Sequence, residues 1–287
     1  MIQYLYLDRV DYAEGLRLQA EIAALRLEGR VENVLLLLEH PPVLTLGRNA
    51  NRANVLASDE LLARRGVTLH EINRGGDVTY HGPGQLVGYP IFDLRSLRNP
   101  SGGRMGPVDF VRLMEEALIR LCGEFGVPAG RIAGLTGVWC GENKVIRDQG
   151  SGVGDRAGSG GAERKIGAIG IHVSRGIVSH GFAFNLTTDL RDFELIVPCG
   201  IPDHAVTSLE REVEHPEDLP GLETIAHRAA RQFGLVLNEQ VLAVESLDAL
   251  RVQAEAAPRQ FPAEDTPLRV PAEVERLTHG EDPPVQA

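Results

Sequence analysis

Lysine is almost absent from this chain of 287 residues. Only Lys144 and Lys165 occur among the 29 basic side chains, and the other 27 are arginine. Arginine stays protonated under almost all conditions, whereas a lysine can release its proton when its surroundings lower its pKa. Codon bias can explain an excess of arginine, but it does not explain why two lysines remain. Both lysines are therefore candidates for proton-transfer chemistry.

Cysteine is also scarce, and its three positions, 122, 140 and 199, follow no regular spacing. The sequence has no C-x-x-C pair, which argues against a disulfide framework and a zinc knuckle. It has no H-x-x-x-H pattern either, so neither a metal nor another cofactor is expected. The odd number of cysteines, without a signal-peptide pattern, predicts a reducing, cytoplasmic setting.

Long apolar runs and a surplus of positive charge are missing too. The longest apolar runs, such as residues 34–38, are far too short to span a bilayer. With 40 acidic against 29 basic side chains the formal charge is −11, which argues against a broad basic surface for nucleic acid. A hydrophobic content of 43% nevertheless suffices for a sizeable core. We therefore expect a soluble, folded protein that binds neither membranes nor nucleic acid.

The hydrophobic pattern predicts short strands mixed with helices. Helical spacing predicts helices over residues 11–30 and 108–125, the second with Cys122 as a core residue, and a short helix between Ser58 and Gly66. Strands are predicted over residues 2–10, 34–38, 67–72, 85–94, 137–140, 165–173, 176–179 and 182–186. This mixture favours an α+β fold, with mixed or antiparallel sheets flanked by helices.

The densest motif is the glycine-rich segment RGGDVTYHGPGQ at residues 74–85, between two predicted strands. It matches neither the phosphate-binding P-loop nor the dinucleotide-binding glycine pattern. Its glycines let the backbone approach a ligand closely, Arg74 supplies a fixed charge, and His81 is expected to titrate near neutrality. We interpret the segment as a ligand-binding loop.

Cys199 is the best candidate for a nucleophile. It lies between Pro198 and Gly200, which break regular structure and tend to expose the thiol. A thiol attacks only as the thiolate, so it needs a cation or a base close by. Residues that could provide one are Lys144, Lys165, His81, His172 and His180.

The other cysteines and two of the histidines have simpler interpretations. Cys140 follows Trp139 in an apolar run, where burial raises the pKa of a thiol and makes it unreactive. We expect Cys140 to be a packing residue. His204 and His215 have polar neighbours in the sequence and are expected at the surface.

Four motifs in colinear order resemble those of the lipoyl(octanoyl) transferases. They are residues 74–85 continuing to 94, residues 38–43, residues 165–170 together with 179–185, and residues 197–200. The resemblance implies an α+β catalytic domain related to lipoate ligases and biotin ligases. It also implies an enzyme that moves an octanoyl or lipoyl group from acyl carrier protein to a lysine of a lipoyl domain. The acceptors implied are the lipoyl domains of 2-oxoacid dehydrogenase complexes and the glycine cleavage H protein.

The resemblance also implies roles for individual residues. Cys199 corresponds to the nucleophile that takes the acyl chain as a thioester, and Lys165 to the acid/base paired with it. Lys165 leads directly into the family pattern IGAIG, whereas Lys144 does not. His40 and His81 correspond to pocket histidines. The implied acyl pocket consists of Arg74, Gly75, Gly76, Asp77, Val78, Thr79, Tyr80, His81, Ala168, Ile169, Gly170, Gly181, Phe182 and Ala183.

The resemblance implies one catalytic domain over residues 1–245. The glycines of residues 148–164 predict a flexible loop, which is longer than the family usually has. Residues 246–287 are expected to form a C-terminal helix remnant and a poorly ordered tail rich in proline and acidic side chains. Because acyl carrier protein and lipoyl domains are acidic, docking is expected to use a local basic patch of Arg48, Arg52 and Arg74. Two alternatives stay open: an ATP-dependent lipoate or biotin ligase, and a non-catalytic acyl-binding homologue.

Overall fold

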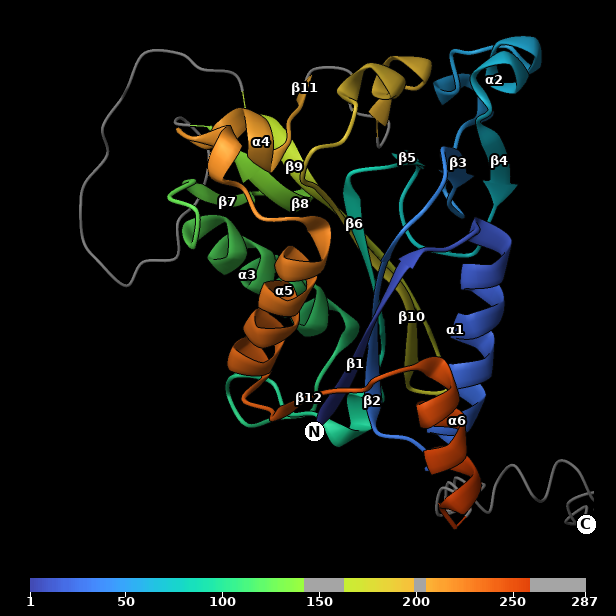
Figure 1. Ribbon diagram of the computed structural model, residues 1–287, viewed down its shortest axis with the longest axis vertical. Helices are drawn as coiled ribbons and strands as arrows, with labels where there is room; N and C mark the ends of the chain where they lie inside the picture. Colours follow the sequence, from blue (N-terminus) through green and yellow to red (C-terminus); the bar gives the residue numbers. More distant parts are fainter. Residues whose placement is uncertain (142–162, 199–204, 259–287) are drawn as a thin grey trace, which may run out of the picture.

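Two sheets organise the chain in a computed structural model, which describes residues 1–141, 163–198 and 205–258 (Figure 1). The larger sheet has the order β12-β1-β2-β6-β10-β9-β8-β7, and β11 pairs with β9 outside this path. Its strands are β1 (Ile2–Arg9), β2 (Asn33–Glu39), β6 (Gln85–Ile91), β7 (Ala129–Ile132), β8 (Leu135–Cys140), β9 (Arg164–Ser174), β10 (Ile177–Asn185), β11 (Ala205–Val206) and β12 (Val241–Ala243). Parallel pairs, β1 with β2 and β12, occur beside antiparallel ones, so the predicted mixed sheet is confirmed.

Helices cover both faces of the larger sheet (Figure 1). α1 (Tyr12–Leu27) and α6 (Leu247–Ala256) lie on one face, and α3 (Pro107–Gly123) and α5 (Leu222–Leu237) on the other. The continuous apolar run of β2 follows from this, because Leu35 and Leu37 pack in the α3–α5 layer while Leu36 and Leu38 pack in the α1 layer. The prediction of a strand buried on both faces is confirmed.

α6 belongs to the α1 layer through Leu250 and Ala254, both 1% exposed. The domain boundary predicted after residue 245 therefore does not coincide with a break in packing. The part of the tail beyond residue 258, most of the predicted loop 148–164, Lys144, Cys199 and His204 lie outside the described residues. Among the residues that are described, no helix has both the length and the apolar character needed to cross a membrane.

The smaller sheet has the order β4-β3-β5, from strands β3 (Val43–Leu46), β4 (Thr68–Glu71) and β5 (Val78–His81). β5 lies within the segment that the sequence predicted to be a loop. The prediction missed it because glycines flank it on both sides. The short helix α2 (Asp59–Arg65) is capped as predicted, since the Ser58 hydroxyl accepts from the Leu61 N–H at 3.3 Å and Gly66 ends the helix with φ 65°.

The two strands predicted at residues 176–179 and 182–186 are a single strand, β10. Its central residues His180 (φ 57°) and Gly181 (φ 156°) depart from extended geometry but keep their pairing with Ile171 and Gly170. The remaining described elements are η1 (Arg52–Asn54), η2 (Leu94–Ser96), η3 (Leu190–Leu195), α4 (Leu209–Glu212) and η5 (Pro216–Asp218).

Candidate active site

A cavity of about 360 Å³ lies on the α1 face of the larger sheet, with β5 along one side. Small residues create it. The cross-strand pair Ala168 and Ala183 and the cross-strand pair Gly170 and Gly181 line the cavity on β9 and β10, whereas the leucines of β2 fill the same face against α1. A Cβ on Gly181 would lie 2.2 Å from the Gly88 carbonyl oxygen, so only glycine fits there.

Most of the pocket residues that the resemblance implied line this cavity. They are Arg74, Gly76, Asp77, Thr79, His81, Ala168, Ile169, Gly170, Gly181, Phe182 and Ala183. The other three face elsewhere. Strand alternation directs Val78 and Tyr80 into the cluster with Phe193, where the Tyr80 hydroxyl donates to Asp192 at 2.8 Å, and the Gly75 N–H donates to the Ile171 carbonyl.

Sequence reasoning did not assign several residues to the cavity: Tyr12, Val87, Tyr89, Gly134, Leu135, Thr136 and His180. His180 was considered only as a possible partner of the Cys199 thiol. Val87 and Tyr89 alternate along β6, so a face assignment for the predicted strand could have found them. Tyr12 comes from the first turn of α1, and no local pattern distinguishes it from a core tyrosine.

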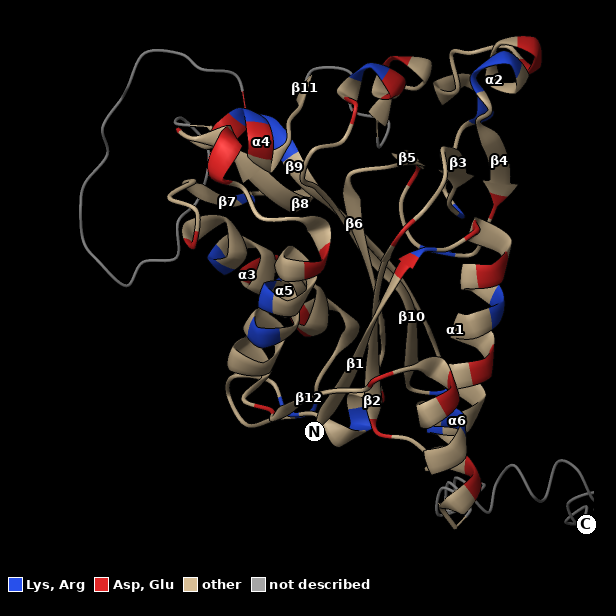
Figure 2. Ribbon diagram, viewed as in Figure 1, with Lys and Arg blue, Asp and Glu red and all other residues tan. Residues whose placement is uncertain are grey.

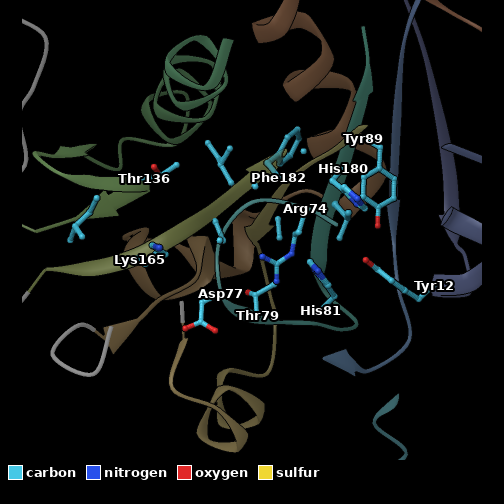
Figure 3. Close-up of a pocket in the computed structure, with 18 of the residues that line it drawn as sticks. Tyr12, Arg74, Asp77, Thr79, His81, Tyr89, Thr136, Lys165, His180 and Phe182 are labelled. Atoms are coloured by element: carbon cyan, nitrogen blue, oxygen red, sulfur yellow. The ribbon is translucent and has the colours of Figure 1, made fainter. Parts of the chain in front are cut away.

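Lys165 lies at one end of the cavity and is only 7% exposed (Figure 3). Its Nζ is 4.6 Å from the centroid of the Trp139 ring, within range of a cation–π attraction. Lys165 also lines a second, small cavity together with Asn185 and Pro198. The described chain ends at Pro198 before the gap at residues 199–204, so the predicted pairing of Lys165 with Cys199 stays a prediction.

The two cysteines that are described are both packing residues. Cys122 and Cys140 are almost fully buried in the α3–α5 layer. Burial raises the pKa of the Cys122 thiol, and burial together with the Glu212 carboxylate raises the pKa of Cys140 to about 12. Neither thiol supplies a thiolate near neutrality, which confirms their interpretation as packing residues.

Arg74 reaches the middle of the cavity from the segment before β5 (Figure 3). Its Nη2 donates to the Thr45 carbonyl at 2.8 Å and to the Thr45 hydroxyl at 2.9 Å, and its Nη1 donates to the Gly75 carbonyl at 3.0 Å. These bonds to β3 hold the guanidinium in place, so a fixed positive charge borders the cavity.

Three histidines near the cavity are neutral at pH 7. Burial lowers the pKa of His40 to about 4, that of His81 to about 3 and that of His180 to about 4, and the Arg74 charge adds to the effect at His81 and His180. The prediction that His81 titrates near neutrality is therefore wrong. His215, in contrast, is exposed as predicted.

Hydrogen bonds define which nitrogen of His40 carries the proton. The Val10 carbonyl can only accept, so His40 Nδ1 donates to it at 2.6 Å, and the neutral Nε2 accepts from the Tyr89 hydroxyl at 2.6 Å. The His40 and His81 rings both contact the ring of Tyr12, at centroid distances of 5.0 and 6.0 Å. Tyr12, His81 and Tyr89 form the end of the cavity opposite Lys165 (Figure 3), and His40 packs behind them.

The expected docking patch of Arg48, Arg52 and Arg74 does not form as one exposed surface. Arg74 is only 9% exposed, Arg52 pairs with Asp59 at 2.9 Å, and Arg48 is exposed. Acidic and basic side chains alternate over the helices on both outer faces (Figure 2). Among the described residues, no group of three or more His, Cys, Asp or Glu side chains could hold a metal ion.

Residues 11–234 match the model of the lipoyl protein ligase A/B catalytic domain. The match spans most of the chain, so the chain belongs to this family, and the predicted family membership is confirmed. Curated relatives with high identity are named octanoyltransferase. The protein from Acidobacterium capsulatum is 58% identical over 86% of this chain and 94% of its own length, and that from Koribacter versatilis is 48% identical over 98% of both.

Solved structures of lipoate-protein ligases share the fold. The bipartite lipoate protein ligase of Thermoplasma acidophilum superposes with a TM-score of 0.60 over 89% of this chain and 91% of its own, at 16% identity. A lipoate-protein ligase A bound with ATP superposes with the same TM-score over 89% and 93%, also at 16% identity. At this identity the likeness establishes the fold alone, and it confirms the predicted α+β architecture.

Proposed function

We propose that this chain is an octanoyltransferase that moves an octanoyl or lipoyl group from acyl carrier protein to a lysine of a lipoyl domain. The curated relatives named octanoyltransferase support the reaction class. One observation carries the site assignment: a largely apolar cavity ends at a buried lysine. A lysine so placed serves chemistry at the head of an acyl chain.

In the proposed mechanism, the Cys199 thiolate attacks the donor thioester and takes the acyl chain. Lys165, as the ammonium, stabilises that thiolate and gives its proton to the departing thiol of the carrier. The acceptor amine then attacks the Cys199 thioester and passes a proton to Lys165, while Cys199 leaves as the thiolate. The first step exchanges one thioester for another and the second forms an amide, so no ATP is consumed.

The cavity supplies most of the affinity for the acyl chain. Each buried CH₂ group contributes about 0.8 kcal/mol, so an eight-carbon chain gains several kcal/mol from apolar side chains that line the cavity on this face, such as Val87, Ala168 and Ala183. Backbone N–H groups of the glycine-rich segments are candidates for stabilising the oxyanion, which is typically worth about 3 kcal/mol. Arg74 and His81 are polar residues of the cavity wall, and the Thr45 hydroxyl contacts both side chains.

The proposed acceptors are lipoyl domains, as carried by 2-oxoacid dehydrogenase complexes and the glycine cleavage H protein. Acyl carrier protein is the proposed donor. The reaction needs neither a metal nor a cofactor. The proposed catalytic residues are Cys199 and Lys165, and the substrate-binding residues are those of the predicted set that line the cavity.

Adduct mapping tests nucleophile, substrate and reaction class together. After incubation with octanoyl-acyl carrier protein, the intact mass should rise by one octanoyl group, and peptide mapping should locate it on Cys199. Cys199→Ser should lose the adduct and the transfer while keeping its thermal unfolding midpoint. An adduct on Cys140 would refute the assignment. Transfer from free octanoate with ATP alone would instead favour the ligase alternative, and binding without turnover would favour the non-catalytic one.

A further inference from the structure

A chain of buried hydrogen bonds begins at His81 in the cavity wall. Gln85 on β6 accepts from His81 Nδ1 at 2.8 Å through its Oε1. Both hydrogens of the Gln85 amide are used, one by the Tyr80 carbonyl at 3.1 Å and one by Asn185 Oδ1 at 2.9 Å. Because Gln85 Oε1 can only accept, His81 must carry its proton on Nδ1, with the lone pair of Nε2 directed toward the Thr45 hydroxyl.

The same chain continues to the backbone of Lys165. Asn185, the last residue of β10, donates from Nδ2 to the Thr207 carbonyl at 2.9 Å. The Thr207 N–H then donates to the Lys165 carbonyl, also at 2.9 Å. From the His81 ring to the Thr207 carbonyl the bonds run in one direction through the amides of Gln85 and Asn185, so each polarises the next. The Thr207 N–H belongs to the preceding peptide group, and its bond to Lys165 is a mechanical link between the two backbones. Gln85, Asn185 and Thr207 are all 5% exposed or less.

The strand at the end of this chain is short. β11 consists of two residues, Ala205 and Val206, which pair in parallel with Arg164 and Lys165. So short a strand has little pairing of its own to define its register beside β9. Two side-chain hydrogen bonds hold its C-terminal end at Thr207: one from Asn185 to the Thr207 carbonyl, and one from the Thr207 hydroxyl to Glu212 at 2.6 Å. The bond from Asn185 connects Lys165 to the cavity wall.

We propose that Gln85 and Asn185 are positioning residues for acyl transfer. They act through their neighbours: Asn185 holds β11 against the backbone of Lys165, and Gln85 holds the His81 ring in one tautomer and orientation. The amine of Lys165 and the wall of the acyl cavity thereby keep a constant separation through both half-reactions. This inference rests on the proposed function, since it needs Lys165 at the reacting end.

Two variants break the chain at different links. Asn185→Ser leaves a side chain too short to join Gln85 to Thr207, and Gln85→Met keeps length and volume while removing every amide hydrogen bond. A displaced reacting group costs up to about 100-fold in rate, so each variant should lose roughly 10- to 100-fold in kcat. KM for octanoyl-acyl carrier protein should stay within about twofold, because neither change alters the apolar walls.

The double variant gives a second readout. If both residues act through one chain of hydrogen bonds, the first substitution already breaks it. The kcat of the double variant should then be no lower than that of the slower single variant. Losses that multiply, or losses confined to KM, would show two unrelated structural effects and overturn the proposal.

Asn33 offers a matched control. It is 3% exposed and lies on β2, and its amide accepts from Asp93 N and Arg26 Nε and donates to Ser96, away from the cavity. Asn33→Ser should lower the thermal unfolding midpoint about as much as Asn185→Ser while keeping kcat within twofold. Equal kcat in these two variants, with an active wild type, overturns this inference alone. A wild-type chain without transfer activity overturns the proposed function and this inference with it.

Discussion

Acidification should destabilise this protein well before its carboxylates are protonated, because three buried histidines resist protonation. The pKa values of His40, His81 and His180 fall to about 4, 3 and 4 in the folded chain, from an ordinary value of 6.5. Between these values the unfolded chain binds more protons than the folded one. The stability that the neutral histidines contribute is therefore complete above pH 6.5 and is lost as the pH falls toward 4.

The size of the effect follows from the pKa values. One pH unit below 6.5 costs each histidine about 1.4 kcal/mol, so the three together cost about 4 kcal/mol between pH 7.5 and pH 5.5. For a protein of this size that corresponds to a fall of roughly 10 °C in the thermal unfolding midpoint. Carboxylates whose pKa is lowered by arginine partners, such as Glu21 and Glu116, contribute only below this window.

Thermal or urea unfolding measured at both pH values tests the prediction. His180→Asn should flatten the pH dependence by about 1.4 kcal/mol, and asparagine tolerates the φ of 57° at this position. His215→Asn removes an exposed histidine and should leave the pH dependence unchanged. The reasoning is refuted if the free energy of unfolding is the same at both pH values, or if the two variants behave alike.

Three further predictions concern transfer, chain length and stability. Lys165→Arg should lower the transfer rate by at least about 100-fold while Lys144→Arg stays within twofold; the opposite result would mean that the other lysine is the acid/base. Val87→Leu adds one methylene at the cavity wall and should reduce the preference in kcat/KM for octanoyl over hexanoyl donors about fourfold, at about 0.8 kcal/mol per CH₂; an unchanged ratio would remove Val87 from the acyl path. Gly181→Ala places a Cβ 2.2 Å from the Gly88 oxygen and should cost more than about 4 kcal/mol in urea unfolding. Gly126→Ala, with open space around it, should cost about 1 kcal/mol, and equal losses would contradict the steric argument.

Local sequence patterns predicted the structure correctly wherever a residue's environment follows from its neighbours in the chain. The cap at Ser58, the helix end at Gly66 and the doubly buried run of β2 all appear in the structure as predicted. The packing role of Cys140 followed from its apolar neighbours. The strand β5 was missed, because its four residues are stabilised by pairing with β3 and by burial of Tyr80 rather than by a local pattern.

The sequence by itself determined the family and the reaction class, because four ordered motifs carry backbone and chemical requirements that only certain residues meet. It also singled out Lys165 by the pattern that follows it. Only the tertiary structure decided the protonation of the histidines, since the low pKa of His81 depends on burial and on His40, which follows β2 and lies 41 positions earlier in the chain. It likewise decided which side of β5 faces the cavity, and it placed Gln85 and Asn185, 100 positions apart, opposite each other on β6 and β10, where their side chains share a hydrogen bond. Contacts between distant segments set desolvation and hydrogen-bond geometry, and no local sequence pattern encodes them.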